Sequence, residues 1–150
     1  MRVRTLTTEL WLPRPVDEIF AFFSDAHNLD VLTPPWLHFR ILTPKPITMH
    51  DGTLIDYRIR VHGIPISWQS EITSWNPPHR FVDVQRRGPY TQWVHTHSFA
   101  DVSGGTRVGD SVEFDVPFAF AVGWLVKRDV ENIFAFRTEA LKKRFAQPAS

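Results

Sequence analysis

Residues 81–99 read FVDVQRRGPYTQWVHTHSF, and this stretch determines the predicted fold. Two runs rich in strand-forming residues flank Gly88-Pro89, which is a turn signal, so the sequence predicts a β-hairpin. Successive side chains of a strand point to opposite faces, so every second residue shares a face. In the second strand of this hairpin, one face carries Trp93, His95, His97 and Phe99.

Both histidines on this face are expected to lie opposite a carboxylate. In the hairpin register that we expect, Asp83 lies across from His95. A following strand is predicted at residues 107–114, after a glycine-rich turn, and its register places Asp110 across from His97. Cross-strand neighbours lie about 5 Å apart at Cβ, so we expect a hydrogen bond within each of these two pairs.

We expect this face to form the concave side of the sheet, under a long helix at residues 119–145. Trp93 and Phe99 bury far more apolar area than Gln92 and Ser98, which point the other way. A slip of one residue would move the whole set to solvent, so the prediction is all-or-none. The same choice places three side chains of the next strand inside: Val108, Val112 and Phe114.

The rest of the chain supplies further strands and two short helices. Pro15 suits the first turn of a helix that carries Val16, Ile19, Phe20 and Phe23 at helical spacing. The sequence predicts an α+β fold: a seven-stranded antiparallel sheet that curls around the long C-terminal helix, with two short helices after the first strand. The other predicted elements are strands at 3–12, 37–42, 53–61 and 64–75, and a short helix at 29–32.

Composition limits the class of protein. The chain has 150 residues, a formal net charge of +1 and no cysteine. These values fit a single domain spanning residues 1–150, exclude disulfides and thiolate metal sites, and give no electrostatic case for nucleic acid. We find no apolar run of the ~20 residues that a membrane span needs, and no apolar stretch of a signal peptide. We therefore expect a cytoplasmic protein.

Aromatic residues are in excess, with six tryptophans and twelve phenylalanines. This surplus suits a cavity wall as well as a core. Trp11, Trp36 and Trp124 are each expected in the core or on a cavity wall. Arg137 lies within the apolar stripe of the long helix, and it is expected either to enter a cavity as an anchor for an anion or to extend to the rim.

The two His–Asp pairs allow several chemical roles. They could act in general acid–base catalysis, orient a ligand, or form a satisfied buried network that holds three strands in register. His95 and His97 could also chelate a metal with Asp83 or Asp110, but we find no second shell for such a site, and we predict neither a metal nor a cofactor. The absence of a nucleophile elbow, phosphate loop, zinc motif and dinucleotide fingerprint argues against hydrolases, kinases and oxidoreductases.

The order of elements resembles the SRPBCC superfamily, which is START/pollen-allergen-like and polyketide cyclase-like. The run from Trp68 to Phe99, with Trp75-Asn76-Pro77-Pro78 and Gly88-Pro89-Tyr90, is similar to a bacterial subgroup of small ligand-binding members, some of which sit beside epimerase-like domains. The resemblance covers the whole chain and implies a helix-grip (START-like) fold. It implies several functions: lipid carriers, hormone receptors, polyketide cyclases and ring-hydroxylase subunits share this scaffold. The iron–sulfur domain that accompanies the ring-hydroxylase subunits is absent from this sequence.

Three hypotheses follow. The first is binding of a small hydrophobic molecule (a lipid, an aromatic or a polyketide-like metabolite) between sheet and helix. The second is a cyclase or dehydratase in which a cavity histidine is the general base and an aspartate holds its tautomer, with His95, His97, Asp83 and Asp110 as candidates. The third is an accessory protein-interaction domain with a filled interior and an exposed apolar patch. The predicted ligand-binding residues are Tyr57, Trp68, Phe81, Asp83, Gln85, Trp93, His95, His97, Phe99, Asp110, Val112, Phe134 and Arg137.

Overall fold

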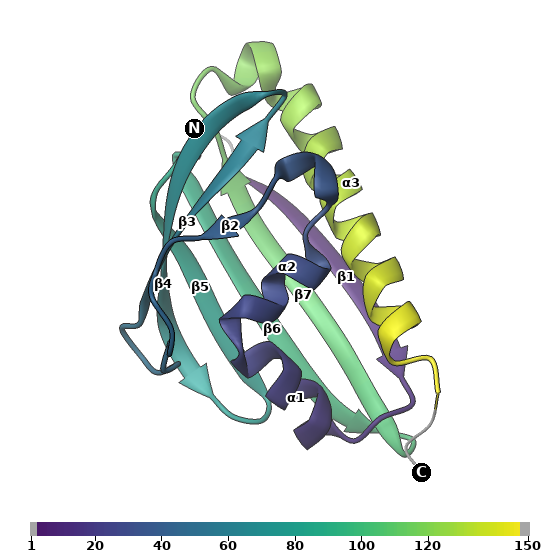
Figure 1. The fold of residues 1–150 in the computed structure, drawn as a ribbon. Helices are drawn as coiled ribbons and strands as arrows, with labels where there is room; N and C mark the ends of the chain where they lie inside the picture. The colour runs from purple at the N-terminus through teal and green to yellow at the C-terminus, as the bar shows by residue number, and fades with distance from the viewer. Residues whose placement is uncertain (1–2, 148–150) are drawn as a thin grey trace.

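An antiparallel sheet forms the frame of the computed structural model, which describes residues 3–147 (Figure 1). Its strand order is β1-β7-β6-β5-β4-β3-β2, so the first strand of the chain pairs with the last. Apart from that closing pair, each strand lies beside its neighbour in sequence; short turns join them, except for the loop of residues 42–53 between β2 and β3. The strands are β1 (Arg4–Leu12), β2 (Arg40–Ile41), β3 (Leu54–Val61), β4 (Ile64–Asn76), β5 (Arg80–Arg87), β6 (Gln92–Val102) and β7 (Gly105–Asp115).

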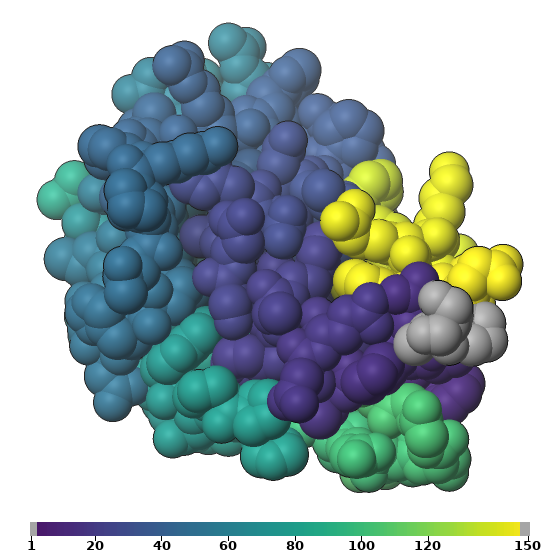
Figure 2. Space-filling view, turned by 60° about the horizontal axis from the view of Figure 1, so that its bottom comes forward, coloured from purple at the N-terminus to yellow at the C-terminus, as the bar shows by residue number. Residues whose placement is uncertain are grey.

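The helices cover the concave face of this sheet. α3 (Ala119–Arg144) is the long C-terminal helix, and α1 (Val16–Ser24) and α2 (Leu29–Leu32) follow β1. Two 3₁₀ turns complete the N-terminal helical segment: η1 (Ala26–Asn28) and η2 (Pro35–Leu37). Figure 2 shows that this segment covers one end of the molecule, between the loop before β3 and the last turns of α3. Neither α3 nor any other helix in residues 3–147 has the length and hydropathy of a membrane span.

The predicted register of the three central strands is confirmed. Asp83 pairs with His95 across β5 and β6, and His97 pairs with Asp110 across β6 and β7. The face is also the predicted one, because His95, His97 and Phe99 are buried. Val108, Val112 and Phe114 of β7 are buried as well. The alternation of large apolar and small polar side chains was therefore sufficient to orient these strands.

Apolar packing closes the end of the molecule that α1 covers. Phe20 and Phe23 of α1 meet Phe99 with ring centroids 5.3 and 5.0 Å apart. Leu141 and Phe145, at the end of the chain's long helical segment, belong to the same core cluster. Burying each such side chain contributes about 2 kcal/mol to the stability of the fold, so apolar packing closes the interior at this end.

Two sequence predictions are wrong. The strand predicted at residues 37–42 is only Arg40–Ile41, because residues 35–37 form η2 and His38 takes a left-handed conformation with φ 48°. Two of the three tryptophans expected in the core or on a cavity wall are in neither place: Trp11 is 47% exposed and Trp124 is 66% exposed. Trp11 packs on the edge of the sheet through its indole N–H bond to the Val102 carbonyl, and Trp124 lies on the solvent side of α3 near Arg128.

The β6–β7 turn gives a test of the β1–β7 contact. A Cβ on buried Gly105 would collide with the Leu12 carbonyl oxygen and with the Trp11 ring. We therefore expect Gly105→Ala to lower the free energy of unfolding by about 3 kcal/mol, because the backbone of β1 must move. Gly104 is the matched control. It has φ +77° and open space around it, so Gly104→Ala should cost only about 1 kcal/mol of backbone strain. Equal midpoint shifts of the two variants in urea denaturation would contradict this account.

Candidate functional site

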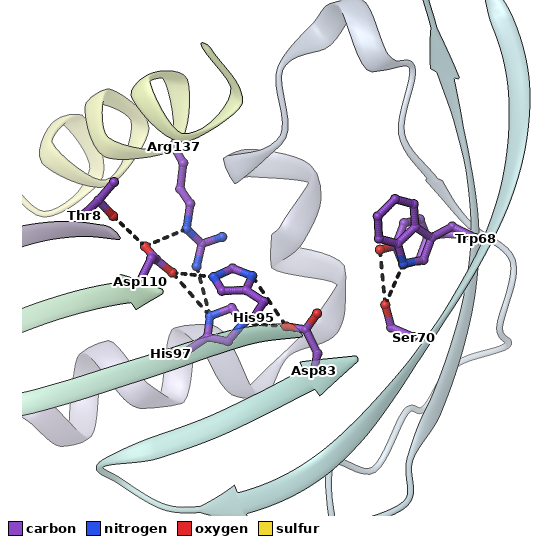
Figure 3. A network of polar contacts seen from close by, with 9 residues as sticks. Thr8, Trp68, Ser70, Asp83, His95, His97, Asp110 and Arg137 are labelled. Atoms are coloured by element: carbon purple, nitrogen blue, oxygen red, sulfur yellow. Dashed lines mark hydrogen bonds and ion pairs between the residues drawn. The ribbon is translucent and has the colours of Figure 1, made fainter. Parts of the chain in front are cut away.

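Five polar side chains meet in the interior and form what we call the polar cluster: Asp83, His95, His97, Asp110 and Arg137. They come from β5, β6, β7 and α3, so the cluster connects the sheet to the long helix (Figure 3). Four of them are buried, and Asp83 is the most accessible, with 18% of its side chain exposed. Among the described residues, each fully buried side-chain nitrogen or oxygen has a hydrogen-bond partner. The fully buried polar atoms of the cluster are therefore all hydrogen-bonded.

The hydrogen bonds run diagonally, which corrects the predicted pairing. His95 Nε2 lies 2.7 Å from Asp110 Oδ1, and His97 Nε2 lies 2.6 Å from Asp83 Oδ2. The directly opposite atoms, His95 Nδ1 with Asp83 Oδ2 and His97 Nδ1 with Asp110 Oδ1, are both 3.6 Å apart. That separation is too long for an N–H···O hydrogen bond. The register prediction was right, but each histidine bonds the carboxylate opposite the other one.

Both ring nitrogens of His97 are bonded to protein. Arg137 Nη2 lies 3.2 Å from His97 Nδ1, and because a guanidinium can only donate, Nδ1 must be the acceptor. His97 Nε2–H then donates to Asp83, so the ring is neutral. Burial is the main reason why the pKa of His97 is lowered to about 4, with His95 adding to the effect. The ring also stacks on Phe81, with centroids 3.9 Å apart, so its orientation is fixed.

His95 has one nitrogen without a protein partner. Asp110 is ionised, so His95 Nε2–H donates to it, and Asp110 holds this tautomer. His95 Nδ1 makes no hydrogen bond within the described residues; its nearest carboxylate oxygen is Asp83 Oδ2 at 3.6 Å. Phe134 packs edge-on against the ring at a centroid distance of 5.2 Å. The two histidines therefore differ: His97 is fully engaged, whereas His95 retains a free nitrogen.

The two carboxylates stay ionised despite their burial. Burial by itself raises the pKa of Asp110, but the Arg137 guanidinium and the hydrogen bond from His95 outweigh it, so that this pKa lies well below its ordinary value. Burial also raises the pKa of Asp83, and its interactions with His95 and His97 bring the pKa below the ordinary value. The cluster therefore holds two negative charges.

Arg137 is the cationic partner of this cluster. Its Nε lies 3.3 Å from Asp110 Oδ2, and the guanidinium lies 5.2 Å from the centre of the Phe23 ring. The side chain is only 6% exposed, so it enters the interior instead of extending to the rim. It does not stand free as an anchor for an anion, because Asp110 already occupies it. Arg137 is therefore the permanent cation beside the two carboxylates of the cluster.

Two adjoining cavities lie on either side of the polar cluster. The larger has a volume of about 460 Å³ and lies between α3, the β3–β4 hairpin and the segment around η2. The smaller, of about 110 Å³, lies beneath α1 and α2. Six side chains border both cavities: Leu29, Leu32, Tyr57, Trp93, His95 and Arg137. The larger volume falls in the range of pockets that hold small organic molecules.

The wall of the larger cavity is mostly aromatic and aliphatic. On this wall, His62 of the β3–β4 hairpin and Asp129 of α3 form a hydrogen bond with Nε2 and Oδ2 2.9 Å apart. Trp36 also borders this cavity and packs against Phe136 of α3, with ring centroids 5.9 Å apart. Trp36 is therefore on a cavity wall as predicted, although half of it faces solvent.

The structure brings most of the predicted site residues to these cavities. Four of them are not on a cavity wall. Gln85 holds the hairpin turn by hydrogen bonds to the backbone of Tyr90, and the other three lie behind the lining: Phe99, Asp110 and Val112. The nine that line a cavity are Tyr57, Trp68, Phe81, Asp83, Trp93, His95, His97, Phe134 and Arg137. That they bind a ligand stays a prediction.

Sequence reasoning missed several residues of this region. Ser70 accepts the Trp68 indole N–H at 2.9 Å and lies 3.2 Å from the Tyr57 hydroxyl, so it orients two aromatic walls. Its position on the same strand face as Trp68 and Ile72 was a usable signal, because alternation predicts that face. Thr8, which donates to Asp110 Oδ2 at 3.3 Å, carried no signal beyond its place on an edge strand.

Side chains that could bind a metal lie close together, but both ring nitrogens of His97 already take part in hydrogen bonds. One ligand atom each from Asp83, His95 and His97 lies within 4.8 Å of the others. His97 Nε2 already donates to Asp83, and its other nitrogen accepts from Arg137, whose positive charge would oppose a cation. This arrangement favours a hydrogen-bonded network over coordination of a metal.

We predict that acid destabilises the fold in two steps. An unfolded histidine takes up a proton near pH 6.5, whereas the pKa of His97 in the fold is about 4, so the unfolded state binds more protons in between. Stability should therefore fall as pH drops from about 6.5 to about 4, by at most about 3 kcal/mol. Below about pH 4 it should fall further, because Asp83 and Asp110 have lowered pKa values.

Urea denaturation at several pH values measures this dependence. His97→Gln should flatten the profile between pH 4 and 6.5, although it lowers stability at neutral pH. His50→Gln, at an exposed histidine, should leave the slope unchanged. An unchanged slope in His97→Gln would contradict the assignment.

Comparison with known proteins agrees with this architecture. A comparison with curated protein sequences finds no significant match. Among solved structures, the chain resembles Ms6760 from Mycobacterium smegmatis, with a TM-score of 0.70 and 19% identity over 97% of both chains. It also resembles the Zhui aromatase/cyclase from Streptomyces sp. R1128, with a TM-score of 0.69 and 15% identity over 99% of this chain and 100% of that one. A third match is a nucleoside-diphosphate sugar epimerase from Corynebacterium glutamicum, with a TM-score of 0.67 and 22% identity. It covers 92% of this chain but only 28% of the epimerase chain. These likenesses show the helix-grip fold. The sequence profile of the polyketide cyclase/dehydrase and lipid transport family matches residues 4–146, and the chain belongs to this family within the SRPBCC superfamily.

Proposed function

We propose that this protein binds a small hydrophobic molecule in the larger cavity. The observation that carries the proposal is the cavity itself: about 460 Å³ bounded mainly by apolar side chains, with His95 and Arg137 of the polar cluster on its wall. Pockets for small molecules have this composition, in which apolar walls supply affinity and a few polar groups fix orientation. The third hypothesis, an accessory protein-interaction domain, assumed a filled interior, and this cavity does not fit it.

The expected affinity follows from the area that a ligand would bury. Enclosing a few hundred Å² of apolar surface at about 25 cal/mol per Å² offsets the cost of association and leaves micromolar binding. Trp68 and Trp93 border the cavity and meet edge to face, with ring centroids 5.3 Å apart. Their fluorescence should therefore change when a ligand enters.

The proposal predicts binding of apolar probes without a covalent step. A panel of fatty acids, naphthalene derivatives and polycyclic phenols should include members that raise the melting temperature and quench tryptophan emission with micromolar midpoints. Native mass spectrometry after gentle purification should show the same complexes at one molecule per chain. If the protein purifies empty and no member of the panel shifts its melting temperature, the proposal fails.

Filling the cavity should abolish this binding. Ile133 of α3 borders the larger cavity, so an indole at this position would occupy the space of the ligand. We expect Ile133→Trp to weaken binding of the best probe at least tenfold while the protein stays folded, because the added volume enters a void. Val122→Trp is the matched control on the same helix, since Val122 is 39% exposed and lies outside both cavities. Equal binding by the two variants would place the ligand elsewhere.

A second candidate function is enzymatic, and one observation favours it. His95 Nδ1 has no protein partner within the described residues and borders both cavities, while Asp110 holds the other nitrogen at 2.7 Å. This is the arrangement of a general base whose tautomer is fixed by a carboxylate. Such a base could remove a proton next to a ketone, as a cyclase or dehydratase requires.

Hydrogen–deuterium exchange tests the enzymatic candidate directly. An aryl methyl ketone such as 2-acetylnaphthalene, incubated with the protein in D₂O, should exchange its methyl protons faster than in buffer, as followed by NMR. His95→Gln should reduce the enzymatic rate by about 100-fold. If the wild-type protein gives no acceleration although the ketone binds, the role of His95 is limited to binding.

A further inference from the structure

We infer that the cavity selects a neutral aromatic molecule bearing a hydroxyl group, whose single proton is shared between His95 Nδ1 and Asp83 Oδ2 in a three-centre hydrogen bond. This inference rests on the proposed function and specifies the chemical class of its ligand. It derives from the hydrogen-bond pattern of the polar cluster, in which the proton of each histidine Nε2 has a defined acceptor.

Two hydrogen-bond acceptors face each other without a donor between them. In neutral His95, the Nε2–H bond to Asp110 leaves Nδ1 as a lone pair. The ionised Asp83 carboxylate offers only acceptors, and its Oδ2 lies 3.6 Å from that Nδ1. A hydroxyl oxygen placed beside this pair would lie within hydrogen-bond reach of both atoms, at about 2.7–3.0 Å. The one hydroxyl proton would lie between the two acceptors, adding to the bond that Asp83 Oδ2 already accepts from His97 and giving His95 Nδ1 a donor.

The position of this acceptor pair relative to the cavities gives the ligand its orientation. His95 borders both cavities, and Asp83 borders the smaller one. A ring system would lie in the larger cavity between Trp68, Trp93 and Ile133, with its hydroxyl directed past His95 toward Asp83. Flat aromatic walls favour an aromatic body over a flexible chain, because stacked and edge-on contacts add to the area buried.

Charge excludes the alternative polar groups. The cluster carries two carboxylates and one guanidinium, and the guanidinium already bonds Asp110 and His97. A carboxylate ligand would therefore meet uncompensated negative charge at Asp83. An ammonium would satisfy that charge but would lose its hydration in a mostly apolar chamber, which is costly. A carbonyl or ether would present another acceptor to two acceptors. A hydroxyl avoids all three penalties.

Three ligands of one shape test this inference: 2-naphthol, 2-methoxynaphthalene and 2-naphthoate. Titration at pH 8 would follow tryptophan quenching and calorimetric heat. We expect 2-naphthol to bind about tenfold more tightly than 2-methoxynaphthalene, since one hydrogen bond to a charged group is lost in the ether, and 2-naphthoate to bind most weakly. Equal affinity for naphthol and its ether, or tighter binding of the naphthoate, would overturn the inference while leaving the proposed function intact.

Variants separate the hydroxyl contact from the rest of the cavity. Asp83→Asn keeps the shape and removes the charge, and His95→Gln removes the imidazole; in each, the preference for 2-naphthol over its ether should shrink to about twofold. The ether is the internal control, because its affinity should stay unchanged in a variant that folds with an intact cavity. A full tenfold preference in both variants would show that the hydroxyl binds elsewhere. Failure of all three ligands to bind the wild-type protein would instead count against the proposed function.

Discussion

The ion pair between Arg137 and Asp110 joins the long helix to the sheet, and the interior depends on it. Arg137 Nε and Asp110 Oδ2 lie 3.3 Å apart in a buried position, and the same guanidinium bonds His97. Removing one partner of such a pair would leave an uncompensated buried charge, at a cost of about 3–5 kcal/mol. The pair therefore fixes where α3 crosses the sheet. The crossing lies between the apolar core cluster under α1 and the larger cavity near the start of α3.

The larger cavity stays open because rigid side chains form its wall. Tyr57 and Trp68 stack with ring centroids 5.7 Å apart, and both are held by Ser70. Trp68 meets Trp93 edge to face, so the aromatic wall is continuous from β3 to β6. Aromatic rings locked by hydrogen bonds cannot collapse into the void as aliphatic chains could. The aromatic side chains that keep this cavity open are therefore the same ones to which the proposed function assigns contact with a ligand.

The sequence predicted the layers of this fold well and the polar chemistry only in part. Alternation along β6 placed His95 and His97 inside, because a strand has a fixed period of two. The diagonal hydrogen bonds could not be predicted, since they depend on side-chain rotamers and on Arg137, a residue of a distant helix. Trp11 and Trp124 show another limit: apolar size favours burial on average, but their positions at a sheet edge and on the solvent side of α3 expose them. Ser70 was missed because a small polar residue in a strand carries little signal by itself.

The two neighbouring histidines of the polar cluster differ in their hydrogen bonds. His97 lies between the Phe81 ring and the His95 ring, has both nitrogens engaged, and is kept neutral by burial; its hydrogen bonds join β6 to β5 and to α3. His95 lies two positions earlier on the same strand face. Its Nδ1 makes no hydrogen bond within the described residues and lies beside the Asp83 carboxylate. The contacts of His97 match the sequence-based expectation of a structural network, whereas a ligand-orienting or basic role for His95 stays a prediction. The two histidines differ because Arg137 reaches His97 Nδ1 and makes no hydrogen bond to His95.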